Sequence, residues 1–216
     1  MNKPFCSFLL ACASLAIPVY AAPKTVITAL PFTITSPGTY ELAGDISFSG
    51  ADTAIQISTA TMGPVILDLM GFTITGNAAS SVGISIGRIN GPDQPPNAYP
   101  ITIRNGTLQT FVYGVFAGIP ASSNFETDIT ISHLTINTHY SIQGSTGIYF
   151  QQVNSSTVRG CTFNGGTYGV VDAQSHGGNS YLNCTFTNIA NPISPEGTSG
   201  LPVTIGHYEF APPPTN

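Results

Sequence analysis

The residues of this chain that are suited to acid–base chemistry gather in one segment of the sequence. Asp172 ends a short apolar run, His176 follows in the loop 173–178, and Arg159 lies a little upstream. A carboxylate, an imidazole and a guanidinium can serve as acid, base and charge stabiliser. Asp172 also falls on the inward side of its predicted strand, where a carboxylate can instead cap a turn by accepting hydrogen bonds from backbone amides.

A second set of side chains is suited to binding a ligand. Phe116 and Tyr149 fall on the outward side of two predicted strands, and Gln151 follows two residues after Tyr149. Two adjacent aromatic rings can form a flat apolar platform for a sugar ring, with amides and hydroxyls around it. The alternative is that the insertion after Gly118 covers these rings, since aromatic residues are common on any sheet.

The elements that must position these residues come from a repeat. Five eight-residue segments align without a gap, and each has Thr at its seventh place and a large apolar residue at its eighth. A strand-rich repeat of this length cannot bury its apolar side alone, so its copies must stack. The segments are residues 67–74, 101–108, 129–136, 156–163 and 179–186.

Shorter apolar runs recur between these octets and predict a further strand in each repeat. They occupy residues 54–57, 83–86, 114–117, 147–150, 169–172 and 192–195. Because side chains alternate between the two faces of a strand, one residue of each run is expected to face outward. The predicted outward column is Gln56, Ser85, Phe116, Tyr149, Val171 and Ser194.

The middle of each octet predicts a corner between two strands. Gly and Asn tolerate a left-handed backbone better than other residues, and four of the five corner residues are of these two types. His133 is the exception. The predicted corner residues are Gly71, Asn105, His133, Gly160 and Asn183.

Three short strands per repeat, with their apolar side chains stacked inside, describe an all-β fold: a single-stranded right-handed parallel β-helix of about six coils. On the runs VILDLMGFTI, ITIRNGTLQTFVYGV and STVRGCTFNGGTYGV, the chain resembles the pectin-lyase-like β-helix repeat family, over roughly residues 40–195. The resemblance implies the solenoid fold. It leaves the activity open, since this architecture hosts lyases, hydrolases and noncatalytic proteins.

The resemblance carries over to few site residues. Ser-His-Gly-Gly around His176 is similar to the Gly-His-Gly segment of polygalacturonase-like enzymes. The paired aspartates and the Arg-x-Lys segment of that family have no counterpart here, and neither does the acidic cluster that holds calcium in pectate lyases. We therefore expect no metal and no cofactor.

The last strand of each repeat predicts a ladder of small polar residues on a third face. Rungs about 4.8 Å apart would align one column of threonines and a second column of Thr, Gln and Asn. Such Thr-x-Thr arrays resemble those of β-solenoid ice-binding proteins, although Thr is favoured on any solvated sheet. The ladder comprises Thr73 and Thr75, Thr107 and Gln109, Thr135 and Asn137, Thr162 and Asn164, and Thr185 and Thr187.

Charge restricts the partners. Charged residues make up 7% of the chain, and the net charge is −5. Without Lys3, which lies near the N-terminus in residues 1–21, four basic residues remain. So few basic side chains cannot neutralise a run of phosphates, which argues against nucleic acid. The exterior is expected to be neutral and rich in hydroxyls, which favours an extracellular glycan as partner.

Two cysteines, Cys161 and Cys184, are expected at the same inward place on neighbouring repeats. Adjacent strands place their Cα atoms about 4.8 Å apart, which lies within disulfide range. Side chains in register run parallel rather than converging, which favours two free thiols stacked in the core. Both alternatives stay open from sequence.

The termini differ from the repeats. Lys3 and the apolar run that follows predict a secretory signal peptide at residues 1–21, with lipidation at Cys12 as an alternative. Residues 22–53 are expected to form an N-terminal cap, 54–210 the β-helix domain and 211–216 a disordered tail. We expect the protein to be secreted, in the extracellular space or at the cell surface, without a membrane span.

These features predict a noncatalytic extracellular carbohydrate-binding or surface scaffold module, in which Phe116, Tyr149 and Gln151 bind the ligand. One alternative is a polysaccharide lyase or glycoside hydrolase that acts at an outer groove through Asp172, His176 and Arg159. The other alternative is an ice-binding protein that uses the threonine ladder.

Overall fold

The computed structural model describes residues 24–58, 63–77, 82–87, 99–118, 126–139, 142–173, 178–196, 204–205 and 208–210. The predicted signal peptide, the predicted tail and His176 lie outside these ranges. The described residues form strands and turns, and no helix occurs among them. Within these ranges the chain therefore has no helix with the length and apolar character that a membrane crossing requires.

The strands form two large sheets and one small sheet. The thirteen-stranded sheet comprises β1 (Lys24–Ile27), β3 (Gly38–Leu42), β4 (Ile46–Ser47), β6 (Val65–Asp68), β7 (Thr73–Thr75), β9 (Ile101–Phe111), β12 (Ile129–Thr138), β15 (Thr157–Arg159), β16 (Thr162–Asn164), β18 (Ser180–Leu182), β19 (Cys184–Thr187), β21 (Thr204–Ile205) and β22 (Tyr208–Phe210). The seven-stranded sheet comprises β2 (Phe32–Ile34), β5 (Thr53–Ser58), β8 (Val82–Gly87), β10 (Tyr113–Gly118), β13 (Thr146–Gln151), β17 (Tyr168–Ala173) and β20 (Asn191–Glu196). The two-stranded sheet pairs β11 (Glu126–Thr127) with β14 (Val153–Asn154).

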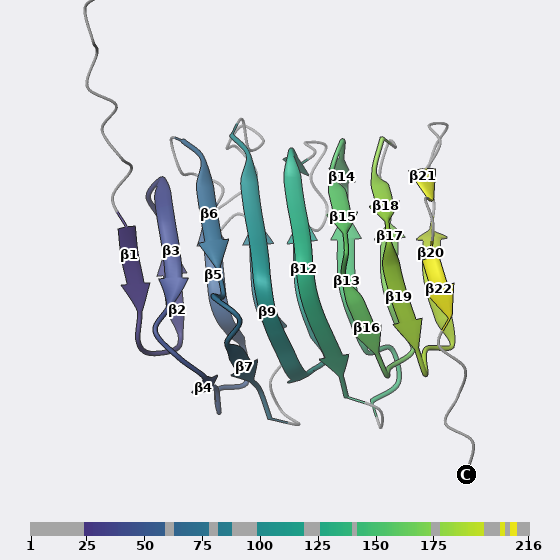
Figure 1. Cartoon of the computed structure of the whole chain (residues 1–216), viewed down its shortest axis with the longest axis horizontal. Helices are drawn as coiled ribbons and strands as arrows, with labels where there is room; N and C mark the ends of the chain where they lie inside the picture. The colour runs from purple at the N-terminus through teal and green to yellow at the C-terminus, as the bar shows by residue number, and fades with distance from the viewer. Residues whose placement is uncertain are drawn as a thin grey trace, which may run out of the picture.

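Successive repeats of the sequence lie side by side in these sheets. The seven-stranded sheet has the order β2-β5-β8-β10-β13-β17-β20, and the central path of the large sheet has the order β1-β3-β6-β9-β12-β15-β18-β21. Both orders follow the chain, as the colour gradient along the long axis in Figure 1 shows. The paired strands run parallel, so each repeat adds a strand to both large sheets in the same direction.

The register confirms the alignment of the octets. Thr107 pairs with Thr73 and with Thr135, and Thr162 pairs with Thr135 and with Thr185. Residues 23 or more positions apart in sequence are therefore neighbours on adjacent strands. One detail differs from the expected three short strands per repeat, because β9 and β12 each continue through the predicted corner as a single long strand.

The predicted corner is a column of left-handed backbone. The φ angles are 83° at Gly71, 58° at Asn105, 53° at His133, 59° at Gly160 and 52° at Asn183. His133 adopts the same conformation as the glycines and asparagines above and below it, although its side chain carries a steric cost there. The geometry of the repeat thus overrides the local preference of the residue.

Alternating apolar residues fill the interior between the strands. Ile101 and Ile103 are buried, whereas Thr102 and Arg104 between and after them are partly exposed. The rings of Phe163 and Phe186 stack inside, with centroids 4.9 Å apart and planes 7° apart. Burying one such aliphatic or aromatic side chain contributes about 1.5–3 kcal/mol, which is why stacked repeats are stable when a single repeat is not.

The predicted cap, residues 22–53, is described from residue 24 onward, and its strands extend the same ladders. β2 pairs with β5, β3 pairs with β6, and β4 pairs with β7, while β1 pairs with β3 at the end of the large sheet. The terminal strand β1 carries Lys24, whose Nζ lies 2.6 Å from Oε2 of Glu41. A charged residue on a terminal strand discourages pairing with another chain.

Cys161 and Cys184 are free and buried, which confirms the expected thiols. Each Sγ lies 3.5 Å from the carbonyl oxygen two residues before it, that of Arg159 for Cys161 and that of Leu182 for Cys184. The hydrogen bond with Cys184, together with burial, raises the pKa of the Cys161 thiol.

Candidate functional site

The predicted outward column lies on the seven-stranded sheet as expected. Its residues are paired from strand to strand, in the order Gln56, Ser85, Phe116, Tyr149, Val171 and Ser194. The adjacent residues Val115, Ile148 and Val170 are fully buried. Successive side chains point to opposite faces of a strand. Because these neighbours point into the interior, the residues of the column point outward, and Phe116 and Tyr149 are partly exposed there.

The two aromatic rings stack on each other. The ring centroids of Phe116 and Tyr149 are 5.5 Å apart and the ring planes differ by 3°. The rings therefore do not form the flat platform predicted from sequence, because one face of each ring is covered by the other. On the outer sides of this pair, Phe116 is paired with Ser85 and Tyr149 with Val171 on the adjacent strands.

Tyr113 completes this group, although it was not predicted from the sequence. Its ring meets Phe116 at 6.0 Å and Tyr149 at 5.7 Å between centroids, with an interplanar angle of 79° in both cases. Such edge-to-face contacts are favourable beyond the area they bury. The signal was present in the sequence, since Tyr113 precedes Gly114 at the start of the same strand as Phe116. We call Tyr113, Phe116 and Tyr149 the aromatic cluster.

The two ends of the aromatic cluster differ. Val171, beside Tyr149, is 2% exposed, so that end is closed. Ser85, which is paired with Phe116, is a small and partly exposed residue. The insertion after Gly118 that was expected to cover the rings begins at residue 119, and residues 119–125 lie outside the described part of the chain.

Gln151 lies on the same strand as Tyr149 and is partly exposed. It pairs with Gly118 on one side and with Ala173 on the other. A Cβ on Gly118 would collide with the backbone carbonyl of Gln151, so the close approach of these strands requires glycine there. Gln151 thus borders the aromatic cluster without a bulky side chain from its neighbour on β10.

Asp172 lies in the interior. It is 0% exposed, and its Oδ2 accepts hydrogen bonds from the Tyr181 hydroxyl at 2.8 Å and from Asn179 Nδ2 at 3.0 Å. Its Oδ1 is buried and has no hydrogen-bond partner among the described residues. The partners are side chains rather than the backbone amides that a turn cap would use, and the carboxylate does not face the aromatic cluster.

The structure does not bring Arg159 and Asp172, the two predicted catalytic residues that it describes, into one group. Arg159 is exposed on β15 of the large sheet, where it pairs with Ser132 and Leu182, while Asp172 is buried on β17 of the other large sheet. His176 lies outside the described residues. The catalytic role of these three residues stays a prediction.

Asp68, on β6 of the large sheet, is held by an ion pair and by hydrogen bonds. Arg104 Nε donates to Asp68 Oδ2 at 2.7 Å, and Asn105 Nδ2 lies 3.2 Å from the same oxygen. Burial of Asp68 disfavours its charged form, but hydrogen bonds from the Met70 backbone amide, Arg104 and Asn105 outweigh burial and lower the pKa of Asp68. This group stabilises the corner.

The polar ladder is in register across five strands. Each threonine of the first column pairs with the next, and the second column of Thr75, Gln109, Asn137, Asn164 and Thr187 does the same. A further column on the same sheet was not predicted from the sequence. It comprises Thr39, Ile66, Thr102, Thr130, Thr157, Ser180 and Thr204.

Among the residues that the structure describes, no three His, Cys, Asp or Glu side chains lie close enough to hold a metal ion. Comparison of the chain with protein-family models, with curated proteins and with solved structures found no match.

Proposed function

We propose that this protein is a noncatalytic carbohydrate-binding module that holds a glycan against the aromatic cluster. The observation that carries the proposal is the partly exposed stack of Phe116 and Tyr149 on an outward column of the sheet, with Tyr113 packed against both rings. Aromatic side chains with a polar end are suited to ligands that are apolar on one side and rich in hydroxyls on the other, as sugars are.

The geometry suggests how a sugar unit binds. On the side away from Tyr149, Phe116 is paired with Ser85, so the C–H groups of a sugar ring pack on Phe116 above Ser85. The Ser85 hydroxyl and the Gln151 amide then offer hydrogen bonds to sugar hydroxyls from the two sides of the cluster. The nearly uncharged exterior of the chain fits a neutral glycan better than a polyanion.

We further propose that the two large sheets are faces of one right-handed parallel β-helix. Support comes from the parallel, in-register pairing of successive repeats in both sheets. The left-handed corner residues support it as well, since they turn the chain at the same place in each repeat. The basic start and apolar run of residues 1–21 support export of the chain to the extracellular space or the cell surface.

Binding is tested with a glycan array, followed by affinity electrophoresis in gels that contain the retained polysaccharide. The double variant Phe116→Ala/Tyr149→Ala is expected to lose retention, because it removes both stacked rings. Tyr99→Ala is the matched control, since Tyr99 is an exposed aromatic residue, 40% accessible, outside the cluster. Absence of retention on every neutral or weakly acidic glycan, or equal retention by the double variant, refutes the proposal.

Ice binding is a second candidate, favoured by the continuous register of the threonine column from Thr73 to Thr185. Equal spacing of about 4.8 Å between rungs presents hydroxyls at a regular interval. Thermal hysteresis and crystal shaping test this candidate. Thr135→Tyr, in the middle of the column, should abolish both effects if they occur. Unshaped crystals with the unmodified chain reject it.

The polysaccharide lyase or hydrolase predicted from sequence has a direct test. Unsaturated products and new reducing ends are measured on a broad panel of polysaccharides. If the predicted site is catalytic, the variants His176→Ala and Arg159→Gln should each lose product formation. Activity that survives both variants places the catalytic groups elsewhere on the protein.

A further inference from the structure

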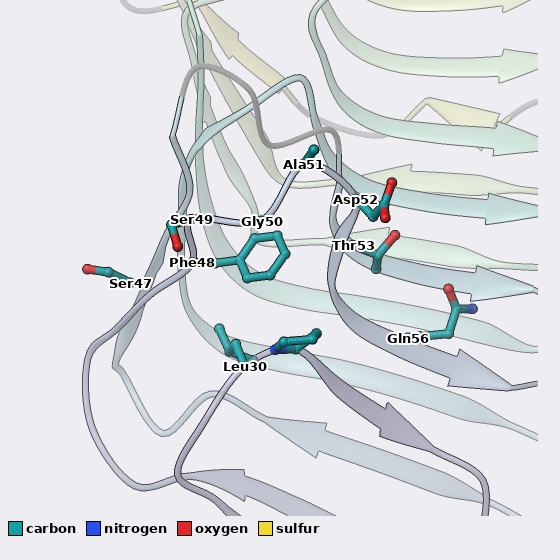
Figure 2. A pocket seen from close by; sticks show the side chains of 10 residues that line it. Leu30, Ser47, Phe48, Ser49, Gly50, Ala51, Asp52, Thr53 and Gln56 are labelled. Carbon is teal, nitrogen blue, oxygen red and sulfur yellow. The ribbon is translucent and has the colours of Figure 1, made fainter.

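A cleft of about 580 Å³ lies beside the first strands of the seven-stranded sheet. It is bordered by the residues just before β2, by the segment between β4 and β5, and by the first half of β5 (Figure 2). Small-molecule sites commonly have volumes of roughly 300–1,000 Å³. None of the residues predicted from sequence to bind or react lies in this cleft.

One side of the cleft is apolar. Leu30 and Pro31 contribute aliphatic surface. The Phe48 ring lies between Leu30 and residues 50–51, as Figure 2 shows. Phe48 is 6% exposed, and its Cζ lies 2.5 Å from the position that a Cβ on Gly50 would occupy. Glycine at position 50 therefore lets the ring sit at the floor of the cleft.

The other side is polar. Asp52, Thr53 and Gln56 follow one another along the start of β5, where Figure 2 shows a carboxylate, a hydroxyl and an amide along one wall. The backbone there is fixed, because the Val82 amide donates to the Asp52 carbonyl oxygen at 3.1 Å. Gln56 Nε2 lies 3.3 Å from the carbonyl oxygen of Ile57, which orients the amide.

The Asp52 carboxylate is the strongest acceptor of this wall. Asp52 is exposed, and within the described ranges no ion pair or hydrogen bond engages its side chain. A single carboxylate is too little for a metal site, and the polar wall does not suit a purely apolar ligand. An ionised carboxylate can accept hydrogen bonds from two neighbouring hydroxyl groups at once, and such charge-assisted bonds are strong.

We propose that this cleft binds one neutral sugar unit through two adjacent hydroxyls, with Asp52 as their acceptor and Phe48 under the C–H face of the sugar. The choice of ligand class rests on the proposed carbohydrate-binding function, while the cleft is separate from the aromatic cluster. Thr53 and Gln56 supply further hydrogen bonds to hydroxyls beside the pair that Asp52 holds.

The cleft and the aromatic cluster share one face of the protein. Gln56 lines the cleft and belongs to the column that continues through Ser85 to Phe116. Two strand spacings separate Gln56 from Phe116, so their backbones are roughly 10 Å apart. A glycan that places one unit in the cleft therefore continues along Ser85 onto the Phe116 ring.

Residue-resolved NMR titration of the whole chain tests the cleft with three defined probes. These are the methyl glycosides of glucose, galactose and mannose, each of which has adjacent hydroxyls. At least one is expected to shift the backbone amides of Thr53 and Gln56, whereas tetrahydropyran, which has the ring without hydroxyls, shifts neither. Asp52→Asn should weaken binding by roughly tenfold or more. Asp128→Asn is the control, because Asp128 is exposed and outside the cleft.

The same spectra separate this inference from the proposed function. Shifts at Phe116 and Tyr149 report on the aromatic cluster, and shifts at Thr53 and Gln56 report on the cleft. Shifts at the cluster alone overturn the cleft and leave the proposed function standing. Shifts at the cleft alone support the inference and count against the cluster. The inference is also overturned if no probe shifts the cleft, or if Asp52→Asn binds as tightly as the unmodified chain.

Discussion

Tyr181 donates a hydrogen bond of 2.8 Å to Oδ2 of Asp172, and this bond joins the two large sheets across the interior. Both side chains are buried, at 2% and 0% exposure. Burial, followed by the negative charge of Asp172, raises the pKa of Tyr181 well above its usual value. The tyrosine therefore stays protonated and remains a donor to the carboxylate.

Removal of this donor should destabilise the fold. Tyr181→Phe keeps the ring but leaves Asp172 with Asn179 as its remaining side-chain partner. Because a buried acceptor that loses a hydrogen bond retains its desolvation cost, we expect a loss of about 1–3 kcal/mol in unfolding free energy. Urea unfolding measures it. Tyr168→Phe is the control, since Tyr168 is partly exposed on the same strand as Asp172. Equal stability of both variants would contradict the structural role of the bond.

We expect Asp68 to make a contribution to the unfolding free energy that is lost in acid. Its pKa in the folded protein lies below the ordinary value of 3.8, so the folded state binds the proton less readily than the unfolded state. This contribution is fully present above the unfolded pKa and is lost as the pH falls through the folded pKa. Comparison of urea midpoints from neutral pH down to pH 3 checks the sign: the difference between the unmodified chain and Asp68→Asn should shrink as the pH falls. A difference that is constant with pH would exclude this linkage.

The two internal thiols should be unreactive in the folded protein. Cys161 and Cys184 are both buried, which keeps a reagent away from either sulfur. The hydrogen bond between them raises the pKa of Cys161 and lowers the pKa of Cys184, so burial protects Cys184 and both burial and protonation protect Cys161. In a chain with Cys6→Ser and Cys12→Ser, a thiol reagent such as dithionitrobenzoate should modify both residues in guanidinium and neither under native conditions. Rapid modification of the native protein would mean that the interior opens near β16 and β19.

His133 should be a site where stability can be gained. Its φ of 53° lies in the left-handed region, and the cost for an ordinary side chain there is roughly 1–2 kcal/mol. His133→Asn should raise the unfolding free energy by up to about 1 kcal/mol, because asparagine tolerates this conformation. Gly160→Ala should act in the opposite direction, since a Cβ there would approach the His133 ring to 3.2 Å. Thermal unfolding of both variants decides between these outcomes.

Much of the strand arrangement was predictable from the sequence. Thr at the seventh place of each octet and an apolar residue at the eighth predicted the pairing of Thr162 with Thr185, which is confirmed. Parallel strands in register repeat the same environment at each step, so residues with the same environment recur at the same place. The outward column from Gln56 to Ser194 and the corner at Gly160 were predictable for this reason.

The orientation of side chains was decided only by the tertiary structure. The outward position of Phe116 and Tyr149 followed from alternation, but the stacking of their rings depends on side-chain torsions and on Tyr113, which packs against both. The hydrogen bond from Tyr181 to Asp172 was equally hidden, since Tyr181 comes from the opposite sheet.

The cleft at Asp52 could not be predicted from the sequence either. Leu30, Phe48 and Gln56 belong to three different segments, and no shared spacing or repeat marks them as neighbours. A repeating sequence determines which strands pair, because each repeat makes the same backbone hydrogen bonds as the one before it. Contacts between side chains of different segments depend on how the whole chain is folded, so the tertiary structure alone decided where this cleft lies and which side chains line it.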